Sequence, residues 1–465
     1  MYRNSQESAA GRMFQVVLVS TYDLGRQPFG LASPAAWLRR AGMRVVCADL
    51  SVEALPEESL AGADLVAFFV PMHTATRLTV PLIARVKDLN PRAHICCYGL
   101  YASANADYLR RLGVGTLLGG EFESGLVRLC KRLQAGDGRA QAEPLVSLER
   151  QEFLVPDRHG LPELTRYARL QRAPGSLVTV GYTEASRGCK HLCRHCPVVP
   201  VYKGKFRIVQ REVVLADIRQ QVEAGAGHLT FGDPDFFNGI GHALPIVEAL
   251  HREYPWLTYD VTIKVEHLLQ HARHLPTLRQ TGCAFVTSAV EAVDDRVLEI
   301  LDKGHTREDF IRLVQLCRRE GLLLNPTFVT FTPWMTIEGY LDLLALLGEL
   351  DLVDQVAPIQ LAIRLLIQEG SRLLERSEVR EQVGPFAPER LSYTWTHPDP
   401  RVDRLHKEVT ALVRRGESGA GSRREVFAAI WDCAHRALEG DRPVPAFSFL
   451  RPPATIPFLT EPWYC

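Results

Sequence analysis

Short apolar runs alternate with helical patterns along the first third of the chain. The runs 14–20 and 64–70 are apolar at almost every position, which is typical of strands that are buried on both faces. Strands that alternate with helices predict a parallel sheet covered by helices on both sides. The predicted strands are 14–20, 44–49, 64–70, 94–98 and 116–118, and the predicted helices are 34–41, 78–89, 104–112 and 122–133.

These elements define the first expected domain and its boundary. Residues 13–140 are expected to form an α/β domain of the Rossmann type, a doubly wound parallel sheet that binds ligands at the carboxyl ends of its strands. Residues 141–173 are rich in Gly, Pro, Arg and Glu and have no sustained apolar period. They are therefore expected to be a linker between domains.

A second series of strand and helix patterns occupies residues 174–370. Six strands with helices between them predict an open (β/α)6 barrel, a partial TIM barrel whose reactive groups lie on loops at the carboxyl ends of the strands. The predicted strands are 177–182, 228–231, 259–265, 285–290, 324–330 and 355–363, and the helices are 242–254, 268–280, 295–301, 307–319 and 337–350. Residues 371–465 are expected to be a small, mostly helical region, with amphipathic helices at 401–414 and 423–438.

Composition limits the classes of protein to which this chain can belong. A chain of 465 residues exceeds what one hydrophobic core usually supports, so more than one domain is expected. Lys and Arg balance Asp and Glu at 54 each, and no basic field indicates nucleic acid as a partner. No apolar run indicates a membrane span or a secretory signal. The 11 cysteines, without disulfide spacing, fit a reducing cytoplasm.

Three cysteines share one short loop after the first strand of the second series. Cys189, Cys193 and Cys196 have the spacing C-x3-C-x2-C, and thiolates at such spacings hold iron–sulfur clusters or zinc. A four-iron cluster with three protein ligands leaves one iron open for a substrate or cofactor. The alternative is a small zinc knuckle with His191 or His195 as the fourth ligand, although no second ligand pair follows. The other cysteines are expected to be buried side chains.

The run Gly188-Cys189-Lys190-His191-Leu192-Cys193-Arg194-His195-Cys196-Pro197 resembles the signature of the radical S-adenosylmethionine (radical SAM) superfamily. The resemblance implies a [4Fe-4S] cluster held by Cys189, Cys193 and Cys196, with S-adenosylmethionine on the open iron. It also implies reductive cleavage of S-adenosylmethionine to a 5′-deoxyadenosyl radical. The expected electron donor is a reductase, flavodoxin or ferredoxin. His195 departs from the pattern, since the family usually has an aromatic residue there.

The same resemblance implies residues that bind S-adenosylmethionine. Gly232, Asp233 and Asp235 follow the second strand, where the family binds the amino group of the cofactor. A carboxylate beside a glycine suits an ammonium group by charge and by access to the backbone. The other positions that match are Lys264 on the third strand and Ser288 and Glu291 on the fourth, and each of these residues is equally compatible with a structural role. No residue is assigned as a general acid or base, so the catalytic residues are unknown.

Residues 13–140 resemble the cobalamin-binding domain that precedes the radical SAM core in a large subgroup of the superfamily. The matching segments are Pro28-Phe29-Gly30, Gly99-Leu100-Tyr101-Ala102 and, most specifically, Gly119-Gly120-Glu121-Phe122-Glu123. Small residues there would allow a flat corrin ring to approach the backbone. The Asp-x-His-x-x-Gly motif that ligates cobalt in many cobalamin proteins is missing, and His73 is not equivalent to its histidine. The domain therefore either binds cobalamin without that ligand or has become a scaffold.

The segment 457–465 resembles the end of a radical SAM family named for a Cys-selenocysteine-Ala-Glu-Pro or Cys-Cys-Ala-Glu-Pro tail. Selenocysteine is encoded by a codon normally read as stop, so the resemblance implies a chain truncated after Cys465. An inconsequential terminus is the alternative. A thiol beside a selenol would suit redox exchange or transfer of sulfur or selenium.

Together these features predict a cytoplasmic radical SAM enzyme. Methylation of a small-molecule or peptide substrate, with cobalamin as methyl carrier if it is bound, is the first hypothesis, and sulfur or selenium transfer is the second. A non-catalytic protein that binds zinc and a corrinoid is the rival from a different class. Methylthiolation of tRNA is disfavoured because Cys96 and Cys97 do not reproduce the additional cluster cysteines of that group.

Overall fold

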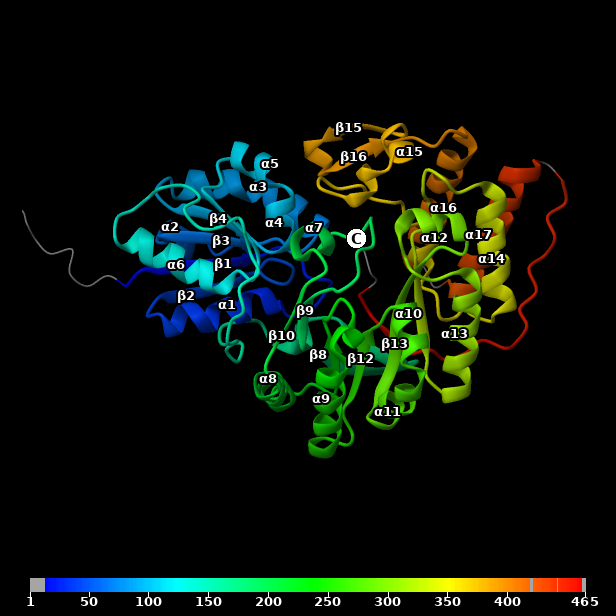
Figure 1. Cartoon of the computed structure of the whole chain (residues 1–465), viewed down its shortest axis with the longest axis horizontal. Coiled ribbons are helices and arrows are strands. Elements are labelled where there is room, and N and C mark those ends of the chain that lie inside the picture. Colours follow the sequence, from blue (N-terminus) through cyan, green and yellow to red (C-terminus); the bar gives the residue numbers. More distant parts are fainter. Residues whose placement is uncertain (1–12, 419–420, 441, 462–465) are drawn as a thin grey trace, which may run out of the picture. The chain divides into compact units, whose positions relative to one another are not determined.

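Two separate parallel sheets organise the chain in the computed structural model, which describes residues 13–418, 421–440 and 442–461 (Figure 1). The sheets belong to two units of structure. Unit 1 comprises the described residues up to Asp23 together with Gln27–Pro162, and unit 2 comprises Leu24–Arg26 and the described residues from Glu163 onwards. Residues 141–162 of the expected linker thus belong to unit 1, and residues 163–173 belong to unit 2.

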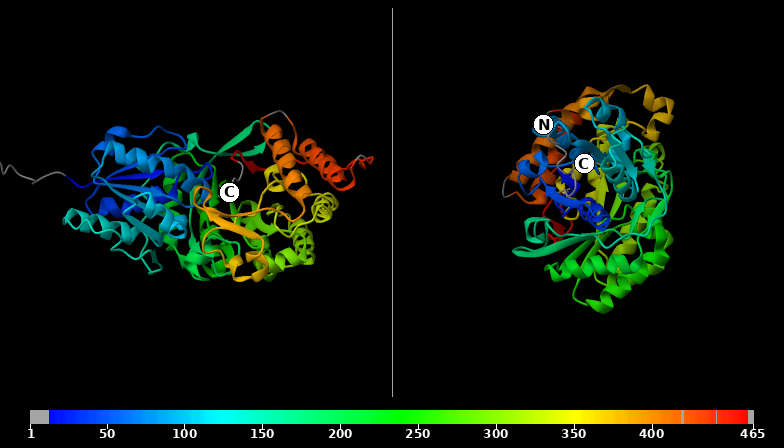
Figure 2. Two further views of the ribbon diagram at one scale, coloured as in Figure 1. Left: turned by 90° about the horizontal axis from the view of Figure 1, so that it is seen from above. Right: turned by 90° about the vertical axis from the view of Figure 1, so that its left-hand side faces the viewer.

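Unit 1 is a doubly wound sheet, as the sequence predicts. Its strands have the order β2-β1-β3-β4-β5-β6 and are all parallel, an arrangement typical of flavodoxin-like folds. The helices cover both faces, which Figure 2 shows from a second direction. The elements are β1 (Gln15–Ser20), α1 (Phe29–Arg40), β2 (Arg44–Asp49), α2 (Glu57–Ala61), β3 (Leu65–Phe69), α3 (His73–Leu89), β4 (His94–Tyr98), α4 (Leu100–Ala104), α5 (Ala106–Arg111), β5 (Thr116–Gly120), α6 (Glu123–Gln134) and β6 (Val146–Ser147).

Two buried clusters hold the layers of unit 1 together. On one face, Leu38 of α1 and Leu129 of α6 pack with Leu18 of β1. On the other face, Ile83 of α3 and Leu109 of α5 pack with the opposite sides of the strands. Alternate side chains of each strand point into one or the other apolar cluster. Most positions of these strands are therefore buried, which explains why their sequences are continuously apolar.

Helix starts in unit 1 differ from the prediction. Helix α1 begins at Phe29 and contains Pro34, the predicted first residue, in its interior. Helix α3 begins at His73 and contains Pro81, whereas the prediction begins at residue 78. A proline in a helical pattern usually marks the first turn, and the packing of these helices against the sheet outweighs that preference. The short strand β6 was not predicted.

Unit 2 contains the predicted partial barrel. Strands β8, β11, β12, β13 and β14 are parallel in that order, and the antiparallel strands β7 and β17 extend the sheet beyond β8. At the sixth predicted position, 355–363, the structure has the 3-10 helix Pro358–Leu361 and a single parallel bridge from Phe331 to Arg364. The strands are β7 (Arg169–Ala173), β8 (Ser176–Thr183), β11 (His228–Phe231), β12 (Thr258–Thr262), β13 (Cys283–Glu291), β14 (Leu324–Phe328) and β17 (Phe458–Leu459).

Helices follow the strands of this sheet, as a partial barrel requires. They include α8, which lies before β11 and was not predicted. Helix α13 begins with a capping box between Thr306 and Asp309 and ends at Gly321, whose φ is +66°. The helices are α7 (Val198–Tyr202), α8 (Arg211–Glu223), α9 (Ile240–Glu253), α10 (Val265–Gln270), α11 (Leu275–Gln280), α12 (Asp295–Leu301), α13 (Arg307–Glu320) and α14 (Ile337–Glu349).

The last part of the chain confirms the two predicted helices and adds short strands. Helices α16 (Pro400–Ser418) and α17 (Arg423–Glu439) occupy the predicted positions, and α17 begins with a capping box between Ser422 and Glu425. The added elements are α15 (Ser377–Arg380) and the two-stranded sheet of β15 (Val383–Ala387) and β16 (Ser392–Trp395). Of the tail 457–465, residues 462–465 lie outside the described residues.

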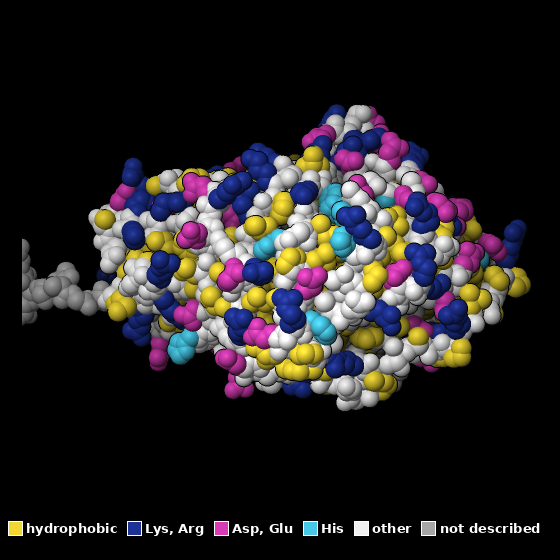
Figure 3. All heavy atoms as spheres, turned by 60° about the horizontal axis from the view of Figure 1, so that its bottom comes forward, with side chains coloured by type: hydrophobic (Ala, Val, Ile, Leu, Met, Phe, Trp, Pro, Cys, Tyr) yellow, Lys and Arg dark blue, Asp and Glu magenta, His cyan; other side chains and the backbone are white. Residues whose placement is uncertain are grey.

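The described surface offers no single-sign field on the face drawn in Figure 3, where basic and acidic side chains are interspersed. Within the described ranges, no helix combines the length and the apolar content that crossing a membrane requires.

Candidate functional site

The three cysteines lie on the loop between β9 (Ser186–Gly188) and α7. The loop begins just past the carboxyl end of β8, where barrel enzymes carry their reactive groups. Gly188 has a φ of +76°, and a Cβ there would lie 2.6 Å from the carbonyl oxygen of Lys205, so the entry to the loop requires glycine. The Arg194 guanidinium donates to the carbonyl groups of Glu299 and Ile300, at 2.9 and 3.0 Å, which ties the loop to the end of α12.

The cysteine thiols are largely buried and close enough to interact electrostatically. Burial raises the pKa of Cys189 to about 11 and that of Cys196 to about 12, and the neighbouring cysteines add to both shifts. Such thiols stay protonated at neutral pH, and a metal ion that takes up the negative charge shifts them to thiolates. Three soft donors on one partly buried loop therefore fit an iron–sulfur cluster.

The spacing of the sulfur atoms also bears on the zinc hypothesis. A tetrahedral zinc with Zn–S bonds of about 2.3 Å needs sulfur atoms about 3.8 Å apart. Among the described residues, only one group of three possible ligands has all its ligand atoms within 4.8 Å of one another, and it does not contain the cysteines. The proposed fourth zinc ligands also point elsewhere, because His191 faces Asp235 and His195 faces Glu291. The cysteine sulfur atoms are therefore not gathered as closely as one tetrahedral zinc ion requires.

A buried ion pair lies beside the cysteine loop. Lys303 Nζ is 3.3 Å from Glu291 Oε1, and His195 Nε2 is 3.2 Å from the same oxygen. Burial alone would raise the pKa of Glu291, but the charges of Lys303 and His195 outweigh it and lower that pKa to about 2. Burial pushes the pKa of Lys303 down, and Glu291, Cys193 and Cys196 reverse that effect. The Lys303 ammonium group is therefore near enough to Cys193 and Cys196 for their charges to affect its pKa.

The loop after β11 is tied to the strand that precedes the cysteines. Gly232 has no room for a side chain, since a Cβ would lie 1.8 Å from the Tyr182 hydroxyl oxygen. The buried carboxylate of Asp233 accepts hydrogen bonds from Ser186 Oγ at 2.5 Å and from the Ala185 backbone N–H at 2.9 Å. Burial raises the pKa of Asp233 to about 7, against the effect of these hydrogen bonds. Both oxygen atoms of Asp233 thus accept hydrogen bonds that hold the loop after β11 against the segment before the cysteines.

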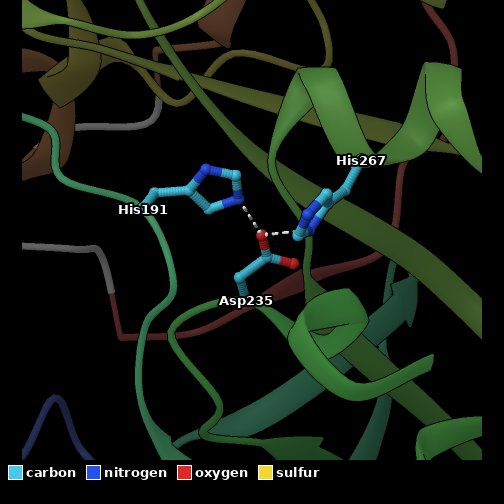
Figure 4. A group of neighbouring side chains, drawn as sticks. All are labelled: His191, Asp235 and His267. Carbon is cyan, nitrogen blue, oxygen red and sulfur yellow. Dashed lines mark ion pairs between the residues drawn. The ribbon is translucent and has the colours of Figure 1, made fainter. Parts of the chain in front are cut away.

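Asp235 lies between two histidines (Figure 4). Its Oδ1 accepts a hydrogen bond from the Phe237 backbone N–H at 3.0 Å. Its Oδ2 is 3.3 Å from His191 Nε2 and 2.7 Å from His267 Nδ1. Lys264 Nζ lies 3.1 Å from His191 Nδ1. Asp235 and Lys264, both predicted from the sequence to bind the cofactor, thus meet at one histidine of the cysteine loop.

Ser288 and Glu291 share strand β13, and Glu291 contacts His195 of the cysteine loop. Ser288 is fully buried, and its hydroxyl group has no hydrogen-bond partner among the described residues. The sequence did not assign a role to His267, Glu266 or Lys303. The only signal for them is their position, because His267 and Glu266 closely follow β12 and Lys303 closely follows α12.

The corresponding loops of unit 1 are glycine-rich and aromatic. A Cβ on Gly30 would lie 2.2 Å from the Phe69 ring, and one on Gly120, whose φ is +72°, would lie 2.2 Å from the Ser147 carbonyl oxygen. Tyr98 donates a hydrogen bond to the Gly30 carbonyl group at 2.8 Å, and its ring centroid is 4.9 Å from that of Phe122. These glycines are required by contacts within the unit itself, and the aromatic rings beside them are buried in its apolar core.

Comparison with known proteins decides the family of unit 2. Residues 183–347 match the model of the Radical SAM superfamily. The chain carries a radical SAM domain. This domain contains the cysteine loop, the loop after β11, Lys264, Ser288 and Glu291, so the resemblance seen in the sequence is confirmed.

Curated relatives share the radical SAM domain at low identity. The hopanoid C-3 methylase of Methylococcus capsulatus is 26% identical over 323 residues, which are 66% of this chain and 62% of the relative. A tRNA-2-methylthio-N(6)-dimethylallyladenosine synthase of Moorella thermoacetica is 26% identical over 229 residues, which are 44% of this chain and 47% of the relative. The chain thus spans less than two thirds of these relatives.

Solved structures share the fold across both units. The cobalamin-dependent radical enzyme OxsB, with aqua-cobalamin and S-adenosylmethionine bound, matches 93% of this chain and 75% of its own with a TM-score of 0.70 and 14% identity. The methyltransferase TsrM of Kitasatospora setae, with cobalamin and a [4Fe-4S] cluster bound, matches 92% of this chain and 100% of its own with a TM-score of 0.66 and 16% identity. These similarities confirm the fold class: a doubly wound domain followed by a partial barrel.

Proposed function

We propose that the protein is a radical SAM enzyme in which Cys189, Cys193 and Cys196 hold a [4Fe-4S] cluster with one open iron. The observation that supports this most directly is the set of three buried or partly buried thiols on one loop of the radical SAM domain, with no fourth thiol beside them in the sequence motif. When bound, the cluster supplies an electron that cleaves S-adenosylmethionine to methionine and a 5′-deoxyadenosyl radical. A reductase, flavodoxin or ferredoxin would provide that electron.

The chain's own residues would hold the cluster and orient the cofactor. Lys303 interacts electrostatically with Cys193 and Cys196, so its positive charge would offset the negative charge of thiolate ligands. Glu291 and His195 keep Lys303 in this buried position. These groups exclude water from one side of the cysteine loop, which protects a radical from side reactions.

We assign S-adenosylmethionine to the carboxyl ends of β11, β12 and β13. Gly232, Asp233 and Asp235 would face its amino group, Lys264 its carboxylate, and Ser288 and Glu291 its ribose or methionine part. Opposite charges support the pairing with Asp235 and Lys264, and the unpartnered hydroxyl of Ser288 supports a ligand near β13.

For the overall reaction, we propose methylation of an unactivated carbon in a small-molecule or peptide substrate, with cobalamin bound by unit 1. The match in fold to OxsB and TsrM, both described as bound to cobalamin, supports this assignment. Sulfur or selenium transfer is the second candidate, and the similarity to methylthio-forming synthases favours it over other radical reactions.

Anaerobic reconstitution of the full chain tests the proposal. The expected result is a brown protein with about four iron and four sulfide ions per chain, which forms 5′-deoxyadenosine from S-adenosylmethionine under a strong reductant. Cys196→Ala should remove the colour and the product, whereas the matched control Cys317→Ala, on the buried face of α13, should keep both. A colourless protein with one zinc ion per chain would refute the proposal. Retention of added cobalamin by the same protein tests the role of unit 1 separately.

A further inference from the structure

Three side chains at the cysteine loop, none of them a cysteine, place their possible metal-ligand atoms close together. His191, Asp235 and His267 offer ligand atoms that all lie within 4.8 Å of one another (Figure 4). The Asp235 Oδ2 atom is the centre of the group, at 3.3 Å from His191 Nε2 and 2.7 Å from His267 Nδ1. Ligands bound to one metal ion at about 2.1 Å lie about 3.0 to 3.4 Å apart in octahedral or tetrahedral geometry. The distance to His191 Nε2, 3.3 Å, lies within this range, and the distance to His267 Nδ1, 2.7 Å, is slightly shorter.

The three residues come from separate elements of the partial barrel. His191 belongs to the cysteine loop, Asp235 caps the 3-10 helix Phe236–Gly239, and His267 lies on α10 after β12. Local sequence therefore does not bring them together. The fold does, at the carboxyl ends of neighbouring parallel strands, where α/β folds bind their ligands.

The ligand atoms are buried and face one another. Asp235 is 1% exposed and His267 is 9% exposed. Among the described residues, Asp235 Oδ2, His191 Nε2 and His267 Nδ1 have no polar partner outside this group, and within it Oδ2 contacts both ring nitrogens. Buried carboxylates in proteins are paired with other groups or coordinate metals, and these three side chains have the donor atoms for either arrangement.

We propose that His191, Asp235 and His267 form a mononuclear site for a divalent transition metal, separate from the cluster. Two imidazoles and one carboxylate suit Fe²⁺, Mn²⁺, Co²⁺ or Zn²⁺ and leave other coordination positions open for water or a substrate oxygen. The family match assigns no metal to these residues, and the sequence motif suggested one only for His191, as the fourth ligand of a zinc knuckle with the cysteines.

Groups around the three side chains fix the orientation of two of them, Asp235 and His191. Asp235 Oδ1 is fixed by the Phe237 backbone N–H at 3.0 Å, so Oδ2 remains directed at the histidines. Glu266 Oε2 is 3.7 Å from His191 Nδ1, and a carboxylate in this position can accept the ring proton of a histidine whose other nitrogen binds metal. Lys264 Nζ lies 3.1 Å from both His191 Nδ1 and Glu266 Oε2, so metal binding requires Lys264 to move from the imidazole towards Glu266.

The metal and the cofactor amino group would compete for one carboxylate. Asp235 also belongs to the loop that we assign to S-adenosylmethionine, and a carboxylate oxygen that binds a metal is not available to an ammonium group. Metal binding to this site does not depend on the cluster, so the two proposals are tested separately.

Cobalt binding to a full chain without cluster ligands tests the metal site. In the background Cys189→Ala, Cys193→Ala and Cys196→Ala, we expect one Co²⁺ per chain, with ligand-field absorption bands but without the intense charge-transfer band that thiolate ligands give. In this background, His267→Ala and Asp235→Asn should each weaken Co²⁺ binding by about 100-fold or more, since even outer-layer partners are worth 10 to 100-fold. His274→Ala, which changes a nearby histidine outside the group, should leave the affinity unchanged.

The outcomes separate the possible roles. Absence of Co²⁺ binding in the cysteine-free background overturns the metal site, whatever the variants do. Binding that survives both Asp235→Asn and His267→Ala also overturns it, because the ion would then bind elsewhere. His267→Asn, which keeps a polar side chain in the site, serves as a second ligand variant if His267→Ala fails to fold by circular dichroism. If Co²⁺ does not bind and Asp235→Asn instead weakens binding of S-adenosylmethionine to the reconstituted holoprotein, the cluster of side chains serves the cofactor alone.

Discussion

The loops at the carboxyl ends of the two parallel sheets differ in their chemistry. In unit 2 they carry thiols, imidazoles, carboxylates and ammonium groups that contact one another, as in the group of Lys303, Glu291 and His195. In unit 1 the ends of β3 and β4 and the first turn of α1 carry buried aromatic rings and a glycine, as at Phe69, Tyr98 and Gly30. Ionisable groups can hold a metal and direct a charged cofactor, whereas buried rings packed against backbone form an apolar layer.

From this contrast we propose that bond breaking takes place in unit 2 and that unit 1 serves binding. The same sheet architecture supports both roles, because function depends on the residues of the loops rather than on the fold. Changes in unit 2 should therefore affect chemistry and pH dependence, and changes in unit 1 should affect packing and ligand retention.

Removal of a cluster ligand should have the largest effect. We expect Cys193→Ala to lose almost all bound iron and all 5′-deoxyadenosine formation, because a three-ligand loop has no replacement donor. Cys283→Ala, which removes a buried thiol in β13 of the same sheet, should keep the iron and lose only about 1 kcal/mol of stability. Iron analysis and product chromatography measure the difference, and equal iron contents in the two variants would contradict the assignment.

Breaking the buried ion pair should come next. Lys303→Met leaves the Glu291 carboxylate buried without its cation, which should lower the free energy of unfolding by about 3–5 kcal/mol. The double variant Lys303→Met with Glu291→Leu removes both charges and should recover most of that loss. Urea unfolding of the metal-free proteins measures both values. A double variant as unstable as the single one would show that the pair does not account for the effect.

The pH dependence of stability offers a smaller effect in the same unit. Burial, followed by the charges of Lys303 and Lys264, lowers the pKa of His305 to about 4. The folded state therefore favours the neutral ring, so this contribution is present above pH 6.5 and is lost as the pH falls towards 4. The parent protein should lose free energy of unfolding between pH 7.5 and pH 4.5 because His305 becomes protonated. In His305→Gln this loss should be smaller by about 2 kcal/mol. Identical differences in the two proteins would argue against a buried neutral His305.

In unit 1 the expected effect is the smallest and concerns packing. A Cβ on Gly30 would meet the Phe69 ring at 2.2 Å, so Gly30→Ala should cost about 1–3 kcal/mol. Gly138→Ala, in the same unit, has no atom within 4 Å of the added Cβ and should leave stability unchanged. Thermal unfolding measures both variants, and 5′-deoxyadenosine formation should remain in each. Loss of that activity in Gly30→Ala with unchanged stability would contradict the division of roles.

Sequence patterns predicted the sheets of both units and the cysteine loop because these depend on local apolar runs and on short spacing. They did not predict the contacts around the loop. His191, Asp235 and His267 are far apart in the chain, and only the register of β11 and β12 in the sheet brings them together. The position of Glu291 in the sequence predicts a cofactor ligand. Its ion pair with Lys303 could not be predicted, because it forms only when the segment after α12 lies beside β13 in the folded protein. The prediction of a sixth barrel strand is wrong for a similar reason. The backbone of residues 358–361 forms the hydrogen bonds of a 3-10 helix and does not pair with a neighbouring strand.

The central claim is that the three thiols hold a cubane whose remaining iron binds S-adenosylmethionine. Mössbauer spectra of the full chain, reconstituted without oxygen with isotopically enriched iron, test it directly. The account predicts a [4Fe-4S] signal in which one iron site changes when S-adenosylmethionine is added. A protein without this signal, or a cubane whose spectrum stays the same with saturating S-adenosylmethionine, would contradict it.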